Sequence, residues 1–485
     1  MFSLKAVLLS VVGAILWFVP IPDGVSLVGW HVLVVFIVSV AGIVLNVMQI
    51  EVIALVAMAV LIATHSITTR QALRGFGSDV LWLVVMAFFI ARGVMKTGIG
   101  NRMAYFFIYK LGGTSLGLSY GVIFVEFILA PLIPSSGARG GGIVYPALQS
   151  VISKYSEVNE AETDDGVSIT AKKKQSNAFA AFLIQSAFHA NVIVGAMFMT
   201  AMAGNPIVIK LAAEHGIHIR WIDWFKIASI PGIASLLLLP LVLAAIFRCP
   251  FRQSDCITSA ARDALKKMGA FKGSEIIMLG IFVMLISLWV FEGVFGIAPT
   301  GVAIIGLVLL LLFRIITLDD MLKEKGAWKI LLWFGIFITL AQILSETGIV
   351  VWISNACNNM ILGSGYSRGV IFVLLCAALF LSHYVFASMS MHLTVMYSTF
   401  LLMFLTFDVI DQMLAALVVA FLSILSGGLT HYGSAVTPIY YGAGYMTIGQ
   451  WWRVCLIVCS ANIVVWSTFG IVWWEKLGLL HIFSS

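Results

Sequence analysis

Apolar runs of roughly 20 residues, a length that spans a bilayer as a helix, follow one another along almost the whole chain. Lipid admits only segments whose backbone N–H and C=O groups are bonded internally, which favours helices. Only 10% of the 485 residues are charged, whereas a soluble domain has roughly 25%. The sequence therefore predicts an all-α polytopic membrane protein with about 11 transmembrane helices.

One stretch between two apolar runs breaks this pattern. Residues 131–146 read PLIPSSGARGGGIVYP, and their prolines and glycines would leave backbone groups without helical partners. Such groups cannot face lipid, so we expect the stretch to be enclosed by protein or to line an aqueous cavity. A cavity at membrane depth that presents N–H groups and hydroxyls favours an anion or an ion pair. The stretch thus indicates the binding centre of a carrier.

The polar breaks come in pairs, one pair in each half of the chain. Hairpin-like breaks lie near 120–150 and 370–405, and Gly/Pro-rich breaks follow near 200–206 and 427–438. Paired interruptions at corresponding places are typical of repeat-built secondary transporters. We therefore predict two inverted repeats, each with a re-entrant hairpin and an unwound helix.

A basic segment separates the two halves. We expect residues 1–250 to form the first repeat, 274–485 the second, and 251–273 a linker that its lysines and arginines place in the cytoplasm. The charged residues 151–176 predict a solvated loop. The six cysteines have no disulfide-framework spacing. A multi-pass protein of a bacterial inner (plasma) membrane, or of an equivalent organellar membrane, fits these features.

Several other classes of protein find no support in the sequence. The basic residues behind the net charge of +6 lie in short loops between apolar runs, so they report topology rather than a nucleic-acid partner. No Walker A or dinucleotide fingerprint appears, which leaves ATP-driven pumping without a basis. An enzyme would need a nucleophile–base pair, and the sequence offers none. An anion-binding membrane sensor stays as an alternative of another class, although it would need a signalling domain.

Several motifs resemble one known family. Residues 134–146 (PSSGARGGGIVYP) are similar to the first signature of the divalent-anion/sodium symporter family, and residues 386–390 (FASMS) to the second. Residues 430–445 resemble its late unwound segment, and residues 200–206 the counterpart in the first half. The similarity runs from about residue 30 to the C-terminus and is greatest to the bacterial and plastid branch. That branch contains citrate, tartrate, succinate and 2-oxoglutarate/malate translocators.

The resemblance implies a fold and a mechanism. Two re-entrant hairpins enter from opposite sides, and their tips meet two unwound helices at a carboxylate site. A moving transport domain carries this site in an elevator-like motion against a dimeric scaffold. We therefore expect a secondary active transporter of small di- or tricarboxylates, of the C4-dicarboxylate, 2-oxoglutarate or citrate type, that works in the bilayer as a homodimer without an organic cofactor.

The hairpin tips depart from the family pattern. Where the family has Ser-Asn-Thr, this chain has Ser135-Ser136-Gly137 and Ser388-Met389-Ser390. Sodium needs several hard oxygen ligands, as the hard alkaline-earth cations do, and the tips lack two amides and a hydroxyl. We therefore expect anion exchange, with sodium-coupled symport as the alternative. A sodium site would then lie near Ser135, Ser136, Gly204, Ser388 and Gly433.

Residues at the breaks are the candidate ligands of the substrate carboxylates. They offer hydroxyls, amides or accessible backbone N–H groups. They are Ser135, Ser136, Gly137, Asn191, Asn205, Ser388, Met389, Ser390, Gly433, Ser434 and Thr437.

Some ionisable residues have two interpretations. Glu126 lies inside an apolar run, where an ionisable group suggests function. It either couples protons or has a structural role, as an ion pair with Arg139 or a cap on the neighbouring hairpin arm. The structural role is the interpretation that we favour. His189, His392 and His431 either line the site or form structural hydrogen bonds.

Overall fold

The computed structural model describes residues 4–45, 47–161, 169–247, 255–349, 351–353, 355–356, 359, 365–407 and 410–480. In this part of the chain all regular elements are helices. Eight are long and apolar enough to span a membrane, and six shorter apolar helices have 10–17 residues. The all-α polytopic fold is confirmed.

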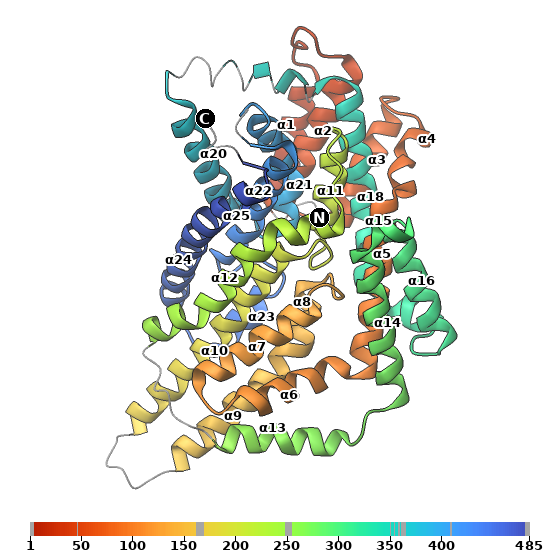
Figure 1. Ribbon diagram of the computed structural model, residues 1–485. Coiled ribbons are helices and arrows are strands. Elements are labelled where there is room, and N and C mark those ends of the chain that lie inside the picture. Colours follow the sequence, from red (N-terminus) through yellow and green to blue (C-terminus); the bar gives the residue numbers. More distant parts are fainter. Residues whose placement is uncertain are drawn as a thin grey trace.

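The helices form two groups that stand side by side (Figure 1). We call the first the lateral bundle; it comprises α2 (Leu27–Val44), α3 (Ile50–Ala63), α5 (Asp79–Thr97), α14 (Gly273–Val290), α16 (Pro299–Leu312) and α18 (Lys325–Glu346). The second is the hairpin bundle; it comprises α7 (Ser115–Leu129), α9 (Tyr145–Ala161), α10 (Ile169–Met197), α12 (Trp221–Phe247), α22 (Gln412–Leu425) and α24 (Ile448–Val465). Each bundle combines helices from both halves of the sequence.

Two helices connect the bundles at one end of the molecule. α6 (Ile99–Leu111) follows α5 after a sharp turn at Gly98, whose φ of 78° favours a residue without a side chain. α13 (Asp255–Met268) lies across the lower end of the molecule in Figure 1 and packs on α6 and α9. The chain thus passes between the bundles through α6 and α13.

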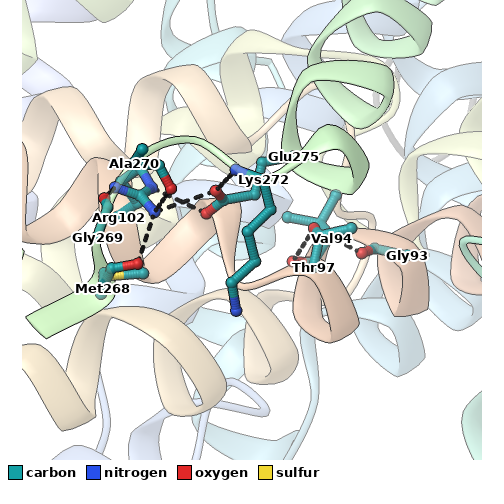
Figure 2. Close-up of polar contacts among 9 residues, drawn as sticks. All are labelled: Gly93, Val94, Thr97, Arg102, Met268, Gly269, Ala270, Lys272 and Glu275. Carbon is teal, nitrogen blue, oxygen red and sulfur yellow. Dashed lines mark hydrogen bonds and ion pairs between the residues drawn. The ribbon is translucent and has the colours of Figure 1, made fainter.

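Arg102 on α6 fastens this connection. Its Nε lies 2.8 Å from Oε1 of Glu275 at the start of α14, and its Nη1 donates to the carbonyl of Gly269 at 2.8 Å. Its Nη2 also faces the carbonyls of Met268 and Ala270 (Figure 2). Both charged side chains are buried. Because the unpaired C=O groups that follow α13 face a cation, α6, α13 and α14 are held at one point.

The charged segment 151–176 differs from the sequence-based expectation. The expected loop at 151–176 is helical where the structure describes it, because α9 continues to Ala161 and α10 begins at Ile169. Asn159 donates to the carbonyl of Lys172 at 3.0 Å and to the hydroxyl of Ser176 at 2.9 Å, so packing of the two helices on each other extends both. The linker, for which only a cytoplasmic position was predicted, contains the helix α13, and its residues 251–254 lie outside the described residues.

Local backbone structures recur at corresponding places of the two halves. Among the described residues, His65 and Arg314 are the non-glycine residues with a positive φ, at 55° and 56°. Three residues after each of them, Thr68 and Thr317 open a short helix with a capping box. The same turn therefore ends α3 in the first half and α16 in the second.

A second matched turn lies further along each half. The hydroxyls of Thr97 and Thr347 each donate to the carbonyl four residues earlier, at 2.9 Å and 2.7 Å. The next residues, Gly98 and Gly348, have φ values of 78° and 77°. Figure 2 shows the first of these turns close to the Arg102 contacts. Each half thus has a left-handed glycine at the end of its longest helix in the lateral bundle.

Candidate substrate site between two hairpins

The first hairpin consists of α7, a break, the short α8 (Ser136–Arg139), a π-turn at Gly140–Val144, and α9. Pro131 and Pro134 stop the helix. Ser135 starts the return arm, because its Oγ accepts the N–H of Ala138 at 3.1 Å. A Cβ at Gly140 would lie 2.5 Å from Cγ2 of Val436. The glycine run therefore lets this arm pack closely on the second half of the chain.

The second hairpin consists of α20 (Arg368–Ser382), a 3-10 turn at His383–Val385, and α21 (Met389–Phe404). Ser388 lies at the N-cap of α21 in extended conformation without a side-chain cap bond. The Met389 side chain is buried in contact with Gly427. Met389 therefore fills space next to the second unwound segment.

Both predicted unwound helices are present. In the first half α10 ends at Met197 and α11 (Asn205–Ala213) follows; in the second half α22 continues into a 3-10 turn and α23 (Thr437–Gly442) follows. Asn205 donates its Nδ2 to the carbonyls of Gly195 and Phe198, at 2.8 Å and 2.9 Å. This amide therefore satisfies carbonyls that the end of α10 leaves free.

Thr437 lies at the position that corresponds to Asn205, directly before a proline. Its Oγ1 accepts the N–H of Ser434 at 3.2 Å and lies 2.7 Å from the Ser434 hydroxyl. All three side chains are buried. The hydrogen bonds of Asn205, Ser434 and Thr437 therefore stabilise the breaks themselves, whereas the sequence predicted these residues as ligands of the substrate.

The hairpin tips cross over between the halves. A Cβ at Gly137 in the first tip would lie 3.5 Å from Cβ of Ala435 in the second unwound segment. A Cβ at Gly204 in the first unwound segment would lie 3.3 Å from Cα of Ser390 in the second tip. Each tip thus contacts the broken helix of the other half, which brings four breaks of the chain to one region.

A buried ion pair holds the first tip. Arg139 Nε lies 2.6 Å from Glu126 Oε2, and both side chains have no exposed surface. Arg139 Nη1 also donates to the carbonyls of Ile133 and Ala201, at 2.7 Å and 2.9 Å. Asn191 donates to both Glu126 oxygens, at 3.1 Å and 3.0 Å. The ion pair, one of the structural roles favoured from the sequence, is present, and it links the tip to the first unwound segment.

A histidine that the sequence did not single out has the corresponding place in the second half. His383 Nε2 is 3.1 Å from the carbonyl of Gly433, which stands five residues before Pro438, as Ala201 stands before Pro206. The only signal in the sequence was its position at the end of an apolar run beside a break. The carbonyl at the same point of each unwound segment therefore faces a nitrogen from its own hairpin.

The three histidines singled out from the sequence have different surroundings. His392 Nε2 is 2.7 Å from the hydroxyl of Ser382, and His431 Nδ1 accepts the indole N–H of Trp452 at 2.9 Å. His189 is buried, and neither ring nitrogen has a hydrogen-bond partner among the described residues. His392 and His431 thus make local structural bonds, whereas His189 leaves both nitrogens available.

The predicted ligands separate into two groups. Asn191, Asn205, Ser135, Ser434 and Thr437 bind other parts of the protein, as described above. The hydroxyls of Ser136, Ser388 and Ser390 form no hydrogen bond with another described residue, so they are available to a bound anion. Gly137 and Gly433 carry no side chain and contribute only backbone groups.

Comparison with known proteins places the chain in a family. Residues 2–480 match the family described as the sodium:sulfate symporter transmembrane region. The chain belongs to this family. It is therefore a multi-pass membrane protein of a transporter family, as the motifs at the breaks indicated.

Relatives within the sodium:sulfate symporter family include bacterial and plastid proteins. The putative malate transporter YflS of Bacillus subtilis is 40% identical over 471 residues, which cover 96% of this chain and 95% of that protein. The chloroplastic dicarboxylate transporter 1 of Spinacia oleracea is 37% identical over 98% of this chain and 82% of its own length. The inner membrane protein YbhI of Escherichia coli is 31% identical over 98% and 97%.

A solved structure shares the fold. The YdaH transporter of Alcanivorax borkumensis, described as having an unusual topology, superimposes with a TM-score of 0.50 over 84% of this chain and 87% of that protein, at 11% identity. At this identity the likeness concerns the arrangement of helices alone.

Proposed function

We propose that this member of the sodium:sulfate symporter family is a secondary active transporter of small di- or tricarboxylates. The substrates are of the C4-dicarboxylate, 2-oxoglutarate or citrate type. Full-length relatives named as malate and dicarboxylate transporters support this substrate class. The observation that carries the proposal is the meeting of two hairpin tips and two unwound segments, where the hydroxyls of Ser136, Ser388 and Ser390 have no hydrogen-bond partner among the described residues. Such groups suit a carboxylate.

The transport mode that we propose is anion exchange without sodium. Sodium would need carbonyl and hydroxyl oxygens at the unwound segments. The Arg139 guanidinium already donates to the carbonyls of Ile133 and Ala201, and Met389 and Gly137 supply no oxygen ligand from their side chains. The sodium-coupled alternative has the family description in its favour. Its ion would lie near Ser135, Ser136, Gly204, Ser388 and Gly433.

An elevator-like motion of the hairpin bundle past the lateral bundle would move the site across the membrane. Supporting this motion, the turns at Gly98 and Gly348 stand where each half leaves the lateral bundle. The matched turns also support two inverted repeats, residues 1–250 and 274–485, joined by 251–273. We propose a homodimer in which the lateral bundles of two copies pair, and chemical cross-linking in native membranes would reveal it as a species of twice the chain mass.

Counter-transport assays test the mode directly. Proteoliposomes loaded with malate or with buffer are given labelled malate, succinate, 2-oxoglutarate, tartrate or citrate in sodium or potassium medium. We expect uptake only into loaded vesicles and at equal rates in both media, because an empty site leaves converging N–H dipoles unpaired in a low-dielectric interior. Strong uptake into empty vesicles that disappears in potassium would replace exchange with sodium symport.

A further inference from the structure

Each hairpin is tied to the broken helix of its own half by a side-chain hydrogen bond. In the first half, Thr200 Oγ1 donates to the carbonyl of Pro131 at 2.6 Å. In the second half, Tyr432 Oη donates to the carbonyl of Tyr384 at 2.8 Å. Both bonds run from an unwound segment to a carbonyl two residues beyond the end of the outgoing hairpin helix, α7 or α20. They therefore have the geometry of tethers that keep a hairpin against its helix.

The two tethers occupy the same place in the two halves. Pro131 and Tyr384 each stand four residues before the first serine of a hairpin tip. Thr200 and Tyr432 each stand six residues before the proline of an unwound segment. The same type of hydrogen bond thus occurs at matching positions of both halves, with a threonine as donor in the first and a tyrosine in the second. The strength of the two tethers can therefore be compared within one molecule.

The tether of the first hairpin is the more strongly reinforced of the two. Thr200 is 3% exposed, and its hydroxyl also accepts the indole N–H of Trp221 at 3.2 Å. Arg139 and Asn191 add the buried bonds described above, including one from Asn191 to the carbonyl of Ser136 at 3.3 Å. Opening this hairpin would break the buried ion pair and several hydrogen bonds and would leave their charged and polar groups without partners. The free-energy cost of this is much larger than that of losing one hydrogen bond.

The second hairpin is held much less firmly. Tyr432 is only partly buried. Among the described residues, one further hydrogen bond joins this hairpin to its broken helix, between His383 and the carbonyl of Gly433. The outgoing arm α20 buries two of its 15 residues, Ile371 and Leu379, whereas α7 of the first hairpin buries nine of 15. Elements with few buried contacts open at lower free energy than well-packed ones.

We propose that Tyr432 is a positioning residue that holds the second hairpin closed over the site, and that this hairpin opens to admit the substrate while the first stays in place. The proposal rests on the proposed transport function. The first hairpin, held by its ion pair, stays closed on one side of the site. The Tyr432 hydroxyl determines how often the second hairpin opens on the other side.

Amide hydrogen exchange of the purified full chain in detergent tests the opening without any transport. In the wild type, residues 386–392 should exchange faster than residues 133–139. Tyr432→Phe removes one hydroxyl and should accelerate exchange at 386–392 by about threefold to tenfold, the size of one net hydrogen bond, with no change at 133–139. Thr200→Val is the matched variant, and it should change exchange at 133–139 by less than about twofold, because the Arg139 and Asn191 bonds remain.

Unchanged exchange at 386–392 in Tyr432→Phe would overturn the proposal, as would a first hairpin that exchanges as fast as the second. Transport adds a second readout: Tyr432→Phe should raise the KM for malate exchange about threefold to tenfold at a nearly constant maximal rate. A lower maximal rate at unchanged KM would indicate a merely structural role and contradict the proposal. If the wild type exchanges none of malate, succinate, 2-oxoglutarate, tartrate or citrate, the proposed function fails, and the hydrogen-exchange result still decides whether the hairpin opens.

Discussion

Glu126 and Arg139 lie 13 positions apart in the sequence and form an ion pair of 2.6 Å with no exposed surface on either side chain. Glu126 belongs to the outgoing arm of the first hairpin and Arg139 to the return arm. Asn191 of α10 completes the pair from outside the hairpin. The pair thus closes the hairpin on itself and at the same time attaches it to the broken helix.

Breaking this pair should destabilise the protein strongly. Glu126→Gln or Arg139→Gln leaves one charge buried without its partner, which costs about 3–5 kcal/mol, whereas Glu126→Leu with Arg139→Met should cost less than the sum of the single changes. Thermal unfolding in detergent, followed by size-exclusion chromatography, measures the loss. The exposed pair of Arg74 with Glu346, about half exposed on both sides, is the control: Arg74→Gln should cost no more than about 1 kcal/mol. Equal losses of stability in the Glu126 or Arg139 variants and in Arg74→Gln would contradict a buried, stabilising ion pair.

The tip serines should control substrate affinity. Ser388→Ala removes a hydroxyl that has no partner among the described residues, and a hydrogen bond to a charged carboxylate contributes about 1.5–3 kcal/mol. We expect an apparent affinity for dicarboxylates about tenfold to hundredfold weaker at unchanged expression. Ser135→Ala should also weaken this affinity, because the cap uses only the Ser135 oxygen as an acceptor and leaves its O–H able to donate to a carboxylate. It should reduce stability as well, because the Oγ accepts the N–H of Ala138 and caps α8.

Ser467→Ala is the control for this pair of variants, since among the described residues its hydroxyl bonds only to carbonyls of the preceding turn, at the end of α24. Its affinity in the same uptake assay should match that of the wild type. Wild-type affinity in both tip variants would move the substrate site away from the hairpin tips.

Two neighbouring glycines should differ in their tolerance of a methyl group. A Cβ at Gly140 would stand 2.5 Å from Val436, while one at Gly142 would meet only Met95 Cε, at 3.5 Å. Gly140→Ala should therefore lower stability by about 1–3 kcal/mol through overpacking and slow transport, whereas Gly142→Ala should behave as the wild type. Thermal unfolding and malate uptake of both variants provide the comparison, and a harmless Gly140→Ala would refute the close packing of the hairpin on α23.

Acid should weaken one contact of the lateral bundle. Lys96 Nζ lies 2.6 Å from Asp320 Oδ2, and this ammonium together with the N–H of Thr317 lowers the pKa of Asp320 from 3.8 to about 2. A depressed carboxyl pKa stabilises the fold above the unfolded value, and this contribution is lost as the pH falls from about 4 to about 2.

The difference in unfolding temperature between wild type and Asp320→Asn should thus be present at pH 7 and shrink towards pH 3. Because Lys96 is 41% exposed, the effect at pH 7 should be small, about 0.2–1 kcal/mol. Asp319→Asn, on the same short helix, is the control: Asp319 forms no ion pair among the described residues, so this change should lower the unfolding temperature at pH 7 less than Asp320→Asn does. A difference between wild type and Asp320→Asn that stays constant from pH 7 to pH 3 would argue against the ion pair.

Much of the fold was predictable because its causes are local. Apolar length sets the membrane spans, and lipid tolerates no free backbone group, so the polar breaks near 131–146 and 427–438 had to be enclosed. Their order along the chain indicated paired hairpins and unwound helices, and the motifs at the tips pointed to the family. The preference for a structural role of Glu126, such as an ion pair with Arg139, followed from the cost of an unpaired charge at that depth.

The tertiary structure decided which group each polar side chain contacts. Asn205 and Asn191 were predicted as substrate ligands, yet one satisfies the end of α10 and the other the Glu126 carboxylate. The roles of Thr200, Tyr432 and His383 were not foreseen at all. A side chain's type limits what it can donate, but the carbonyl that it meets depends on how hairpins and broken helices from distant parts of the sequence cross, and no local pattern encodes that crossing.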